Sequence, residues 1–460
     1  MSDRKQLYAV IGQPIFLSRS PQLYNLGFKE LKIDAVYLRL AGYFLKEVMR
    51  TAKELNLSGL NVTAPYKEKI ISYLDSLDEK AAAIGAVNTV VREKGRLKGY
   101  NTDPDGFQQA AGKMQKRIRG QEVLVWGAGG AARAALYALK EMGAGSVWIT
   151  NRSRQRGKRL AAEFGLSFLS TDKALSSLGR FKLIVACIPH LKELGAIVSL
   201  AANCWQPGTK NHAAIKRPPG AKVLATNYHY SEMNNKEKIR KKSDHHMLTS
   251  GLVWLFGQGV KALEIYTRRK IGPALQKKLR AQVLKAGKNK KNLALIGFMG
   301  AGKSLVGREL ADRLGWDFLD TDELIEAQSG LKIETIFERY GESHFRQLEK
   351  VLIPPFLQRV SHTVFALGGG AILDSEVRSS LRNSSNVVWL WSSFEEIMAR
   401  TRESVRPLAQ GKNREEIEAL LGSRIPLYAA CSDLVVANRP GKTKDTVRLI
   451  HEEIGPAFSH

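Results

Sequence analysis

Short apolar runs alternate with amphipathic segments along the whole chain. Residues 35–40, AVYLRL, have the apolar and β-branched character of a strand, and residues 44–55, FLKEVMRTAKEL, are typical of an amphipathic helix. A second strand-like run, GLNVT at 59–63, follows directly. Because strand-like and helix-like segments keep alternating to the C-terminus, the pattern predicts an α/β fold with a mostly parallel sheet.

Two breaks in this pattern predict domain boundaries. Between a helix-like stretch at about 251–284 and the strand LALIGF, the basic segment 285–291 has no apolar periodicity and is typical of a flexible linker. Near residue 105 the hairpin-like sequence TVVREKGRLKGYNTD gives way to a helix and then to the strand EVLVW. We expect domains at 1–105, with the helix of about 251–284 packing back on it, at 106–250 and at 292–460. Because the linker is polar, we expect the parts on either side to be independent modules.

Length and charge restrict the class of protein less than the motifs do. At 460 residues the chain is long enough for two or three domains, and its formal net charge of +27 suits small anionic ligands as well as nucleic acid. The densest basic runs, at 236–242 and 285–291, lack interleaved aromatic residues and are interpreted as solvated loops. The cysteines, Cys187, Cys204 and Cys431, are too far apart for a metal site. Since no stretch reaches the length of a membrane span, we expect a cytoplasmic protein that binds no membrane. From the character of the basic runs, we also expect that it binds no nucleic acid.

The segment GFMGAGKS at 297–304 fits the phosphate-binding pattern G-x-x-x-x-G-K-[ST] in full. It follows a strand-like run and precedes the helix-like LVGRELADRLG, which is the context that this loop requires. Backbone N–H groups at the helix start can bind phosphate oxygens, the lysine can reach the terminal phosphates, and the serine hydroxyl can ligate Mg²⁺. The residues expected to bind ATP are Gly300, Ala301, Gly302, Lys303 and Ser304.

Groups suited to a hydroxylated acid follow this loop. WDFLDTDELIE places Asp320 and Asp322 at the end of the next strand, where one carboxylate can serve the metal and the other can face a hydroxyl. The strand VFAL then runs into three glycines at 368–370, which allow a ligand to approach the backbone closely. Arginine side chains suit carboxylate and phosphate groups. Those of FRQLE, VRPLA and SRIPLY are Arg346, Arg406 and Arg424.

Taken in this order, the P-loop, LDTD, FRxxE, LGGG, RPL and RxPLY closely resemble shikimate kinase over residues 290–460. The resemblance implies that Asp322 binds the shikimate hydroxyls and accepts the proton, and that Asp320 helps to hold Mg²⁺ through water. It implies a lid at about 403–414, from which Arg406 closes over the phosphates. It also implies a clamp for the shikimate carboxylate, formed by Arg346, Arg424 and the nearby Gly369. Two departures from the family pattern, Leu305 and Ala430, replace no reacting group.

VLVWGAGGAARAAL at 123–136 combines a strand, a tight glycine turn and a helix start, which is the arrangement of a dinucleotide-binding loop. An NAD-binding domain usually has an acidic residue at the end of the next strand, where this chain has NRSRQR. Arginines at that position favour a 2′-phosphate, so the cofactor is predicted to be NADP. The residues expected to contact it are Gly127, Ala128, Gly129, Gly130, Ala131, Asn151, Arg152, Ser153 and Arg156.

Polar residues that could bind a hydroxylated acid lie at strand and turn ends upstream of this loop. They are Ser18, Ser20, Asn61, Thr63, Asn88 and Asn101. Lys67 and Asp103 form a pair that could transfer a proton. Together with GLVWLFGQGVKALEIYT, the motifs around these residues resemble shikimate dehydrogenase across residues 6 to about 275.

This second resemblance makes Lys67 the acid/base residue with Asp103 as its partner. The residues that it gives to the substrate are Ser18, Ser20, Thr63, Asn88 and Gln258. The roles are chemically sound, because an ammonium beside a carboxylate can protonate the alkoxide that forms as hydride reaches the 3-keto carbon. The chain departs from the family at Leu17, which replaces a histidine, at residues 186–188, which replace Asn-Ala-Thr, and in ATNYHY, which lacks an aspartate.

We therefore expect a bifunctional enzyme, in which NADPH reduces 3-dehydroshikimate to shikimate and ATP phosphorylates shikimate at its 3-hydroxyl. Two alternatives stay open. In one, the kinase alone is active and the degenerate dehydrogenase half acts as a ligand sensor. In the other, the chain is a basic nucleic-acid-binding regulator, which the lack of a reading helix or aromatic platform in the sequence disfavours. The sequence leaves the oligomeric state open.

Overall fold

The computed structural model describes residues 5–112, 115–188, 222–225, 251–285, 290–401 and 413–458. The chain divides into two compact units, one made of residues 1–63 with 281–460 and the other of residues 64–280. This division differs from the predicted boundary near residue 105, because residues before Ala64 group with the C-terminal part of the chain. We call residues 5–285 the N-terminal half and residues 290–458 the C-terminal half.

The first unit contains a run of eight strands in the order β13-β14-β12-β15-β16-β2-β1-β3. All pairings between these strands are parallel, and most of their residues are buried, as expected when helices cover both faces of a sheet. The strands are β1 (Gln6–Gly12), β2 (Ala35–Ala41), β3 (Gly59–Val62), β12 (Asn292–Ile296), β13 (Asp317–Asp320), β14 (Thr363–Ala366), β15 (Ser385–Trp391) and β16 (Leu434–Ala437).

Amphipathic helices connect these strands. The helices are α1 (Ser20–Glu30), α2 (Leu45–Glu54), α13 (Lys303–Leu314), α14 (Thr321–Ser329), α15 (Ile333–Arg359), α16 (Ser375–Ser384), α17 (Phe394–Thr401), α18 (Arg414–Cys431) and α19 (Thr443–Phe458), with the short 3₁₀ helix η4 (Ala371–Leu373). The predicted strands at 35–40 and 59–63 and the predicted helix at 44–55 are confirmed as β2, β3 and α2. Within α15 the chain turns at Gly341, whose φ of 78° lies in the left-handed region that favours glycine.

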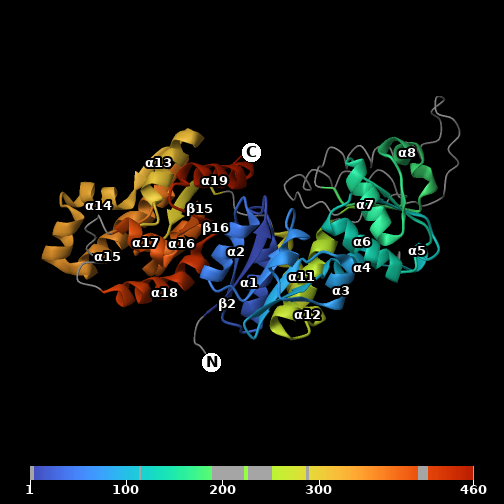
Figure 1. The fold of residues 1–460 in the computed structure, drawn as a ribbon. Helices are drawn as coiled ribbons and strands as arrows, with labels where there is room; N and C mark the ends of the chain where they lie inside the picture. Colours follow the sequence, from blue (N-terminus) through green and yellow to red (C-terminus); the bar gives the residue numbers. More distant parts are fainter. Residues whose placement is uncertain are drawn as a thin grey trace. The chain divides into compact units, whose positions relative to one another are not determined.

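Strand β16 pairs with β2, so one sheet contains strands from both halves of the chain (Figure 1). The register joins Val435 to Leu40 and Val436 to Ala41. The expectation of independent modules is therefore wrong for residues 5–63, which share a sheet with the C-terminal half. Local sequence carries no signal for this pairing, because a buried parallel strand has the same apolar pattern whichever strand lies beside it.

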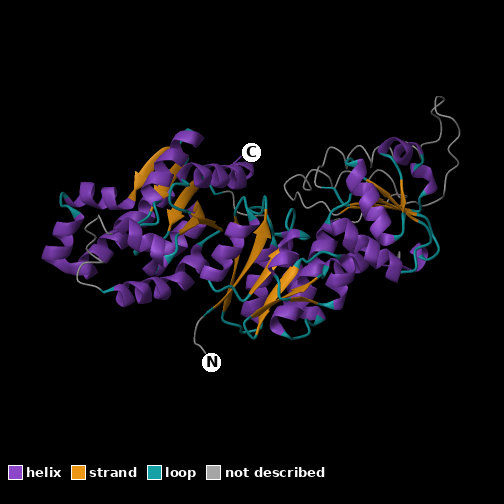
Figure 2. Ribbon diagram, viewed as in Figure 1, coloured by secondary structure: helices purple, strands orange, loops and turns teal. Residues whose placement is uncertain are grey.

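The second unit contains a five-stranded parallel sheet in the order β11-β10-β7-β8-β9. Figure 2 shows helices beside the strands of this unit. The central strand of this sheet, β7, is covered on both faces. Val123 and Val125 point into one hydrophobic cluster, whereas the alternating residues Leu124 and Trp126 belong to another. A second set of strands, β5, β6 and β4, combines an antiparallel hairpin with one parallel pairing. The strands of this unit are β4 (Ser76–Leu77), β5 (Thr89–Glu93), β6 (Arg96–Tyr100), β7 (Val123–Trp126), β8 (Val147–Thr150), β9 (Ser167–Phe168), β10 (Leu183–Ala186) and β11 (Lys222–Ala225).

The helices of the second unit are η1 (Lys69–Tyr73), α3 (Glu79–Ile84), α4 (Asp103–Ala111), α5 (Gln115–Ile118), α6 (Gly130–Glu141), α7 (Arg154–Phe164), α8 (Thr171–Ser176), η3 (Leu178–Arg180), α11 (Gly251–Thr267) and, crossing into the first unit's range, α12 (Pro273–Leu284). The helix predicted at about 251–284 is thus two helices, because Pro273 lacks the N–H that a continuous helix needs there. Helix α11 packs on α4 very closely, since a Cβ on Gly106 would overlap the Trp254 carbonyl oxygen.

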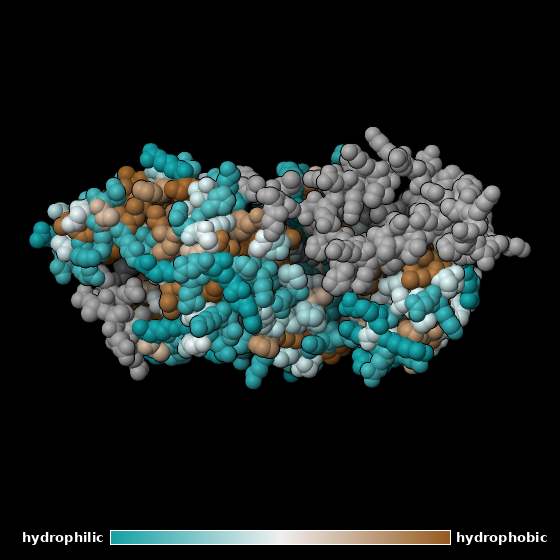
Figure 3. Space-filling view, turned by 90° about the horizontal axis from the view of Figure 1, so that it is seen from above, coloured by the Kyte–Doolittle hydropathy of each residue, from teal (hydrophilic) through white to brown (hydrophobic). Residues whose placement is uncertain are grey.

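On the face of the described residues that Figure 3 shows, hydrophobic residues gather in patches between hydrophilic ones. Large exposed apolar side chains include Phe44, Leu305 and Val351. Within the described ranges, no helix has both the length and the apolar character to cross a bilayer.

Candidate functional sites

The predicted P-loop lies between β12 and α13, with Lys303 as the first residue of the helix. Gly302 has a φ of 84°, and a Cβ there would lie 2.5 Å from the Asn438 side-chain nitrogen, so both conformation and space require glycine. The Lys303 ammonium donates to the Gly297 carbonyl oxygen at 3.0 Å and to that of Phe298 at 3.2 Å. The loop therefore places backbone N–H groups and a cation at the positive end of a twelve-residue helix, which is an arrangement suited to phosphate groups.

Oxygen ligands lie directly beside this loop. The Ser304 hydroxyl donates to Oδ2 of Asp320 at 2.6 Å, and Oδ1 of Asp320 accepts from the backbone N–H of Asp322 at 3.0 Å. The strand β13 ends at Asp320, which caps α14, so strand and helix together fix the two aspartates. A hydroxyl and a carboxylate are donors that Mg²⁺ accepts, so these residues fit a magnesium ion that also keeps water ligands.

The glycines after β14 bring the second aspartate and both arginines to one place. A Cβ on Gly368 would lie 2.7 Å from Oδ1 of Asp322, and a Cβ on Gly370 would overlap the Arg346 guanidinium. Arg424 donates to the carbonyl oxygen of Gly369 at 3.2 Å. The structure thus brings together the residues that the sequence predicted for binding a hydroxylated carboxylate.

Glu349, the glutamate of the FRxxE motif, is a member of this site to which the sequence prediction gave no role. It lies one helical turn after Arg346, and its Oε2 accepts from that guanidinium at 2.5 Å. Its side chain is buried, and a Cβ on Gly368 would lie 2.9 Å from its Oε1. Burial raises the pKa of Glu349 to about 7; Arg346 opposes this rise, and the nearby Asp322 adds to it. The carboxyl group can therefore change charge near neutral pH beside the arginine that is predicted to bind substrate.

Two further residues that the prediction missed hold the P-loop in place. Arg400 donates to the carbonyl oxygen of Gly300 at 3.1 Å, and Asn438 donates to that of Ala301 at 2.7 Å. Arg400 also donates to the backbone oxygen of Asn438 at 2.7 Å, so the two side chains form one network. Neither stands in a motif of the sequence, because each acts through a carbonyl group of a distant segment.

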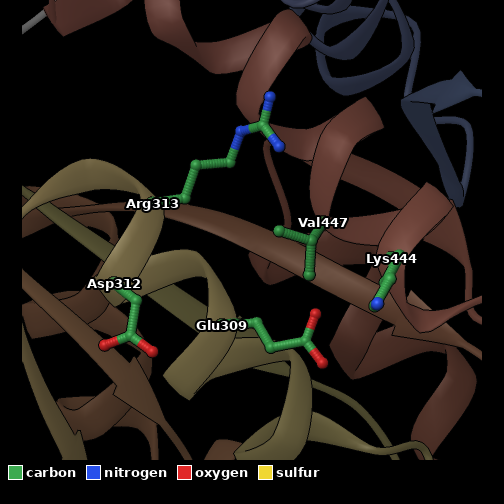
Figure 4. Close-up of a pocket in the computed structure, with 5 residues that line it drawn as sticks. All are labelled: Glu309, Asp312, Arg313, Lys444 and Val447. Atoms are coloured by element: carbon green, nitrogen blue, oxygen red, sulfur yellow. The ribbon is translucent and has the colours of Figure 1, made fainter.

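Arg406, the predicted lid arginine, lies outside the described residues. A pocket between α13 and α19 is lined by Glu309, Asp312 and Arg313 from the first helix and by Lys444 and Val447 from the second (Figure 4). It lies along the second half of α13, whereas the P-loop ends in the first turn of that helix. The pocket is thus separate from the phosphate-binding loop.

The predicted dinucleotide loop connects β7 to α6 in the second unit. Gly127 has a φ of 124°, and a Cβ there would lie 2.5 Å from the carbonyl oxygen of Cys187. The N-terminus of α6 follows at Gly130, so this loop also presents backbone N–H groups at the positive end of a helix. Asn151 and Ser153 lie at the end of the next strand, β8, where Ser153 caps α7.

The arginines after β8 are exposed, as a site for a 2′-phosphate requires. Arg156 donates to Glu68 at 2.9 Å, and its guanidinium would lie 3.9 Å from a Cβ on Gly129. This distance places a positive charge near the dinucleotide loop.

Lys67 lies against this loop, since a Cβ on Gly130 would lie 2.8 Å from the lysine Cβ. Its ammonium forms an ion pair with Oδ2 of Asp103, which is almost fully buried. Oδ1 of the same carboxylate accepts from Asn88 at 3.0 Å, and Asn88 also donates to Gln258 at 3.2 Å. Four residues predicted from separate motifs therefore form one polar network beside the dinucleotide loop.

Four other predicted substrate residues, Ser18, Ser20, Asn61 and Thr63, lie in the first unit. The Ser18 hydroxyl donates to that of Ser20 at 3.2 Å, between β1 and the start of α1. Asn61 lies in β3 and accepts from the Tyr37 hydroxyl at 2.6 Å, and the Thr63 backbone N–H donates to Ile11 at 2.9 Å. These four residues share the carboxyl ends of neighbouring parallel strands, where ligands of α/β proteins usually bind.

The two sites define an enzyme that combines a dinucleotide-dependent dehydrogenase with a P-loop phosphotransferase. Family profiles match in the same order: the shikimate dehydrogenase substrate-binding domain at residues 10–90, shikimate/quinate 5-dehydrogenase at 109–194 and shikimate kinase at 299–454. The chain belongs to the shikimate dehydrogenase family and carries a shikimate kinase domain after it. It is a bifunctional enzyme of the shikimate pathway that uses NADP and ATP.

Similar proteins cover the N-terminal half. An NADP⁺-dependent shikimate dehydrogenase of Bacillus cereus (strain G9842) is 41% identical over 275 residues, which are 57% of this chain and 93% of that protein. The enzyme of the same name from Nitrosopumilus maritimus (strain SCM1) is 34% identical over 263 residues, 56% of this chain and 92% of its own. The crystal structure of Thermus thermophilus shikimate 5-dehydrogenase with NADP(H) and shikimate is 29% identical, covers 61% of this chain and 100% of its own, and has a TM-score of 0.48.

Proposed function

We propose that the N-terminal half reduces 3-dehydroshikimate to shikimate and that the C-terminal half phosphorylates shikimate at its 3-hydroxyl. In this scheme NADPH supplies the hydride, ATP supplies the phosphoryl group and Mg²⁺ neutralises charge on the phosphates. The observation that carries the proposal is the Lys67–Asp103 ion pair lying against the dinucleotide loop at Gly130. A proton donor beside a bound dinucleotide is what the reduction of a ketone requires.

For the reduction, we assign proton transfer to Lys67. Its ammonium donates to the developing alkoxide, while the buried Asp103 carboxylate orients the ammonium. Asn88 and Gln258 hold that carboxylate through a hydrogen-bond network and offer polar groups to the substrate, as do Ser18, Ser20, Asn61 and Thr63. The arginines after β8, Arg152 and Arg156, bind the 2′-phosphate of the cofactor.

For the phosphorylation, Asp322 orients the accepting hydroxyl and takes its proton, and Arg346 and Arg424 bind the carboxylate. Lys303 and the N–H groups of the P-loop bind the phosphates. Support for Mg²⁺ at Ser304 and Asp320 comes from their two oxygens, which lie 2.6 Å apart next to the phosphate-binding loop. Arg406 would stabilise the transferring phosphoryl group.

The test is a single assay that follows NADPH oxidation by absorbance and the phosphorylated product. Lys67→Ala should lower the reduction rate by roughly 10²- to 10⁴-fold, because general acid catalysis is lost. It should leave phosphorylation of added shikimate near wild type. Asp322→Asn should have the opposite effect.

Neighbouring exposed residues provide matched controls, Lys69→Ala for the lysine and Glu323→Gln for the aspartate, and both should be neutral. If the wild-type chain binds shikimate but reduces no 3-dehydroshikimate at any cofactor concentration, the N-terminal half is a ligand sensor. Equal loss of both activities in either variant would contradict the assigned division of labour.

A further inference from the structure

The loop that carries Ser18 is held by a carboxylate from the C-terminal half. This loop, which we call the serine loop, comprises residues 13–19 between β1 and α1. Its backbone N–H groups at Ile15 and Phe16 donate to the same oxygen, Oε2 of Glu453, at 2.7 and 2.9 Å. Glu453 lies on α19, at the far end of the sequence, and only 1% of it is exposed. Two adjacent N–H groups that converge on one buried carboxylate form strong, charge-assisted hydrogen bonds.

A second contact fixes the other end of the same loop. Arg39, a buried residue of β2, donates to the backbone oxygen of Ser18 through Nη2 at 2.7 Å and through Nε at 3.2 Å. Its remaining nitrogen donates to the backbone oxygen of Asp433 at 3.0 Å, immediately before β16. The guanidinium therefore connects the carbonyl group of a predicted substrate residue to the chain of the C-terminal half.

Glu453 is a buried acidic residue among the apolar residues of its own helix. Its neighbours Ile450 and Ile454 are buried apolar residues of α19, and Glu453 is a buried charge between them. Burial raises the pKa of its carboxyl group, whereas the two N–H groups and Arg39 lower it. A buried carboxylate costs stability unless hydrogen bonds compensate for lost hydration, and here the compensating donors belong to the serine loop.

We propose that Glu453 is a positioning residue for the dehydrogenase reaction, supplied by the kinase half of the chain. It orders the serine loop, so that the hydroxyl groups of Ser18 and Ser20 are presented to the substrate in a fixed geometry. Without Glu453, substrate binding would have to order the serine loop, and this ordering would lower the affinity for substrate. Glu453 should therefore act mainly on the KM for 3-dehydroshikimate. This inference rests on the proposed role of the two serines in substrate binding.

The experiment uses the full-length chain and measures steady-state kinetics of both activities. Glu453→Ala leaves two buried N–H groups without their acceptor, so we expect the KM for 3-dehydroshikimate to rise about tenfold or more. The KM for NADPH and the kinetic constants for phosphorylation of shikimate should change less than about threefold, because Glu453 touches neither nucleotide loop in the described structure. Glu453→Gln keeps an acceptor oxygen, so its KM for 3-dehydroshikimate should lie close to that of the wild type.

Controls separate positioning from general damage. Glu452→Ala changes the adjacent, half-exposed carboxylate, which accepts from the Tyr43 hydroxyl, and should leave every constant unchanged. Arg39→Met removes the second contact to the serine loop and should raise the same KM. Each variant is compared with wild type by thermal unfolding, so that a loss of folded protein is not mistaken for weaker binding.

The results distinguish this inference from the proposed function. Ser18→Ala should raise the KM for 3-dehydroshikimate; if it does not, the proposed role of the serine is wrong. If Ser18→Ala raises this KM but folded Glu453→Ala does not, the serine binds substrate and the positioning role of Glu453 is wrong. A parallel fall of both activities in Glu453→Ala, without recovery in Glu453→Gln, would likewise overturn the positioning role and leave a purely structural one.

Discussion

Arg439 forms a buried polar contact that joins the two halves through several hydrogen bonds, and its replacement by methionine should destabilise the first unit as a whole. The guanidinium donates to Glu396 of the C-terminal half at 2.9 Å and to Glu54 of the N-terminal half at 3.0 Å. It also donates to the Thr51 hydroxyl at 2.8 Å, and Arg439 is 9% exposed. Methionine has similar length but no charge, so Arg439→Met removes the buried cation that joins the two carboxylates and leaves them only the more exposed Arg50.

The size of the expected loss of stability depends on the hydrogen bonds that the two carboxylates retain in Arg439→Met. Removing one partner of a buried ion pair costs about 3–5 kcal/mol. Glu54 retains hydrogen bonds from the Trp391 indole at 2.7 Å and from Arg50 at 2.8 Å, so we expect a cost at the lower end of this range. A loss of about 3 kcal/mol corresponds to a fall in Tm of about 6–12 °C for a unit of this size.

Thermal and urea unfolding of the full chain measure this loss, with both enzyme activities as local reporters. Arg448→Met is the matched control, because Arg448 also joins the halves, at 3.1 Å from the Tyr43 hydroxyl, but has a side chain 52% exposed. An exposed contact contributes little to stability, so the control should be near wild type. Adding Glu54→Gln and Glu396→Gln to Arg439→Met should recover most of the loss. Equal, small effects of Arg439→Met and Arg448→Met would refute the reasoning.

Three further predictions concern the cofactor, the kinase pH profile and the linker. Arg152→Ala should raise the KM for NADPH and leave that for NADH almost unchanged, since only the former loses a charge-assisted contact in steady-state assays. Because the pKa of Glu349 is raised to about 7, its carboxyl group becomes charged as the pH rises through that value and then competes with the substrate carboxylate for Arg346. The KM of the kinase for shikimate should therefore rise as the pH increases through about 7. Glu349→Gln should make this KM less dependent on pH. A chain cleaved within residues 286–289 should elute as one species in size-exclusion chromatography, because the β2–β16 pairing and the Arg439 contacts remain.

Each of these predictions has a clear contrary result. Similar catalytic efficiency with NADH and NADPH in the unmodified chain would contradict the cofactor assignment. An unchanged pH profile in Glu349→Gln would show that another group titrates. Separate elution of the cleaved fragments at micromolar concentration would mean that the contacts between the halves are too weak to matter.

The parts of both sites that the sequence predicted well are contiguous in the chain. The P-loop is one strand, one turn and one helix start, so its glycines, Lys303 and Ser304 reveal their geometry by spacing alone. The dinucleotide loop is the same kind of local unit. Asp320 could be placed beside Ser304 because it ends the next strand, and parallel strands bring their carboxyl ends to one edge of a sheet.

The parts that the sequence did not predict depend on contacts between distant segments. Glu453 looks like one more charge on an amphipathic helix, and its function as an acceptor appears only when residues 438 positions away donate to it. Arg439 and Arg39 resemble surface arginines in the sequence, yet both are buried by groups from the opposite half. The titration of Glu349 near neutral pH likewise depends on burial, which local spacing does not encode.

The pairing of β2 with β16 gives the fusion a structural reason that the linker alone does not. Taken by themselves, the strands of the C-terminal half end at β16, and those of residues 5–63 end at β2. An unpaired edge strand exposes backbone N–H and C=O groups and invites pairing with other chains. The register between the two edges joins just two residue pairs, so backbone hydrogen bonds alone would hold it weakly. Arg39, Arg439 and Glu453 all make their contacts around this short pairing, and each requires a specific partner in the other half. The apolar strands therefore provide the surface on which the halves meet, and the buried charges specify the one register in which they do so.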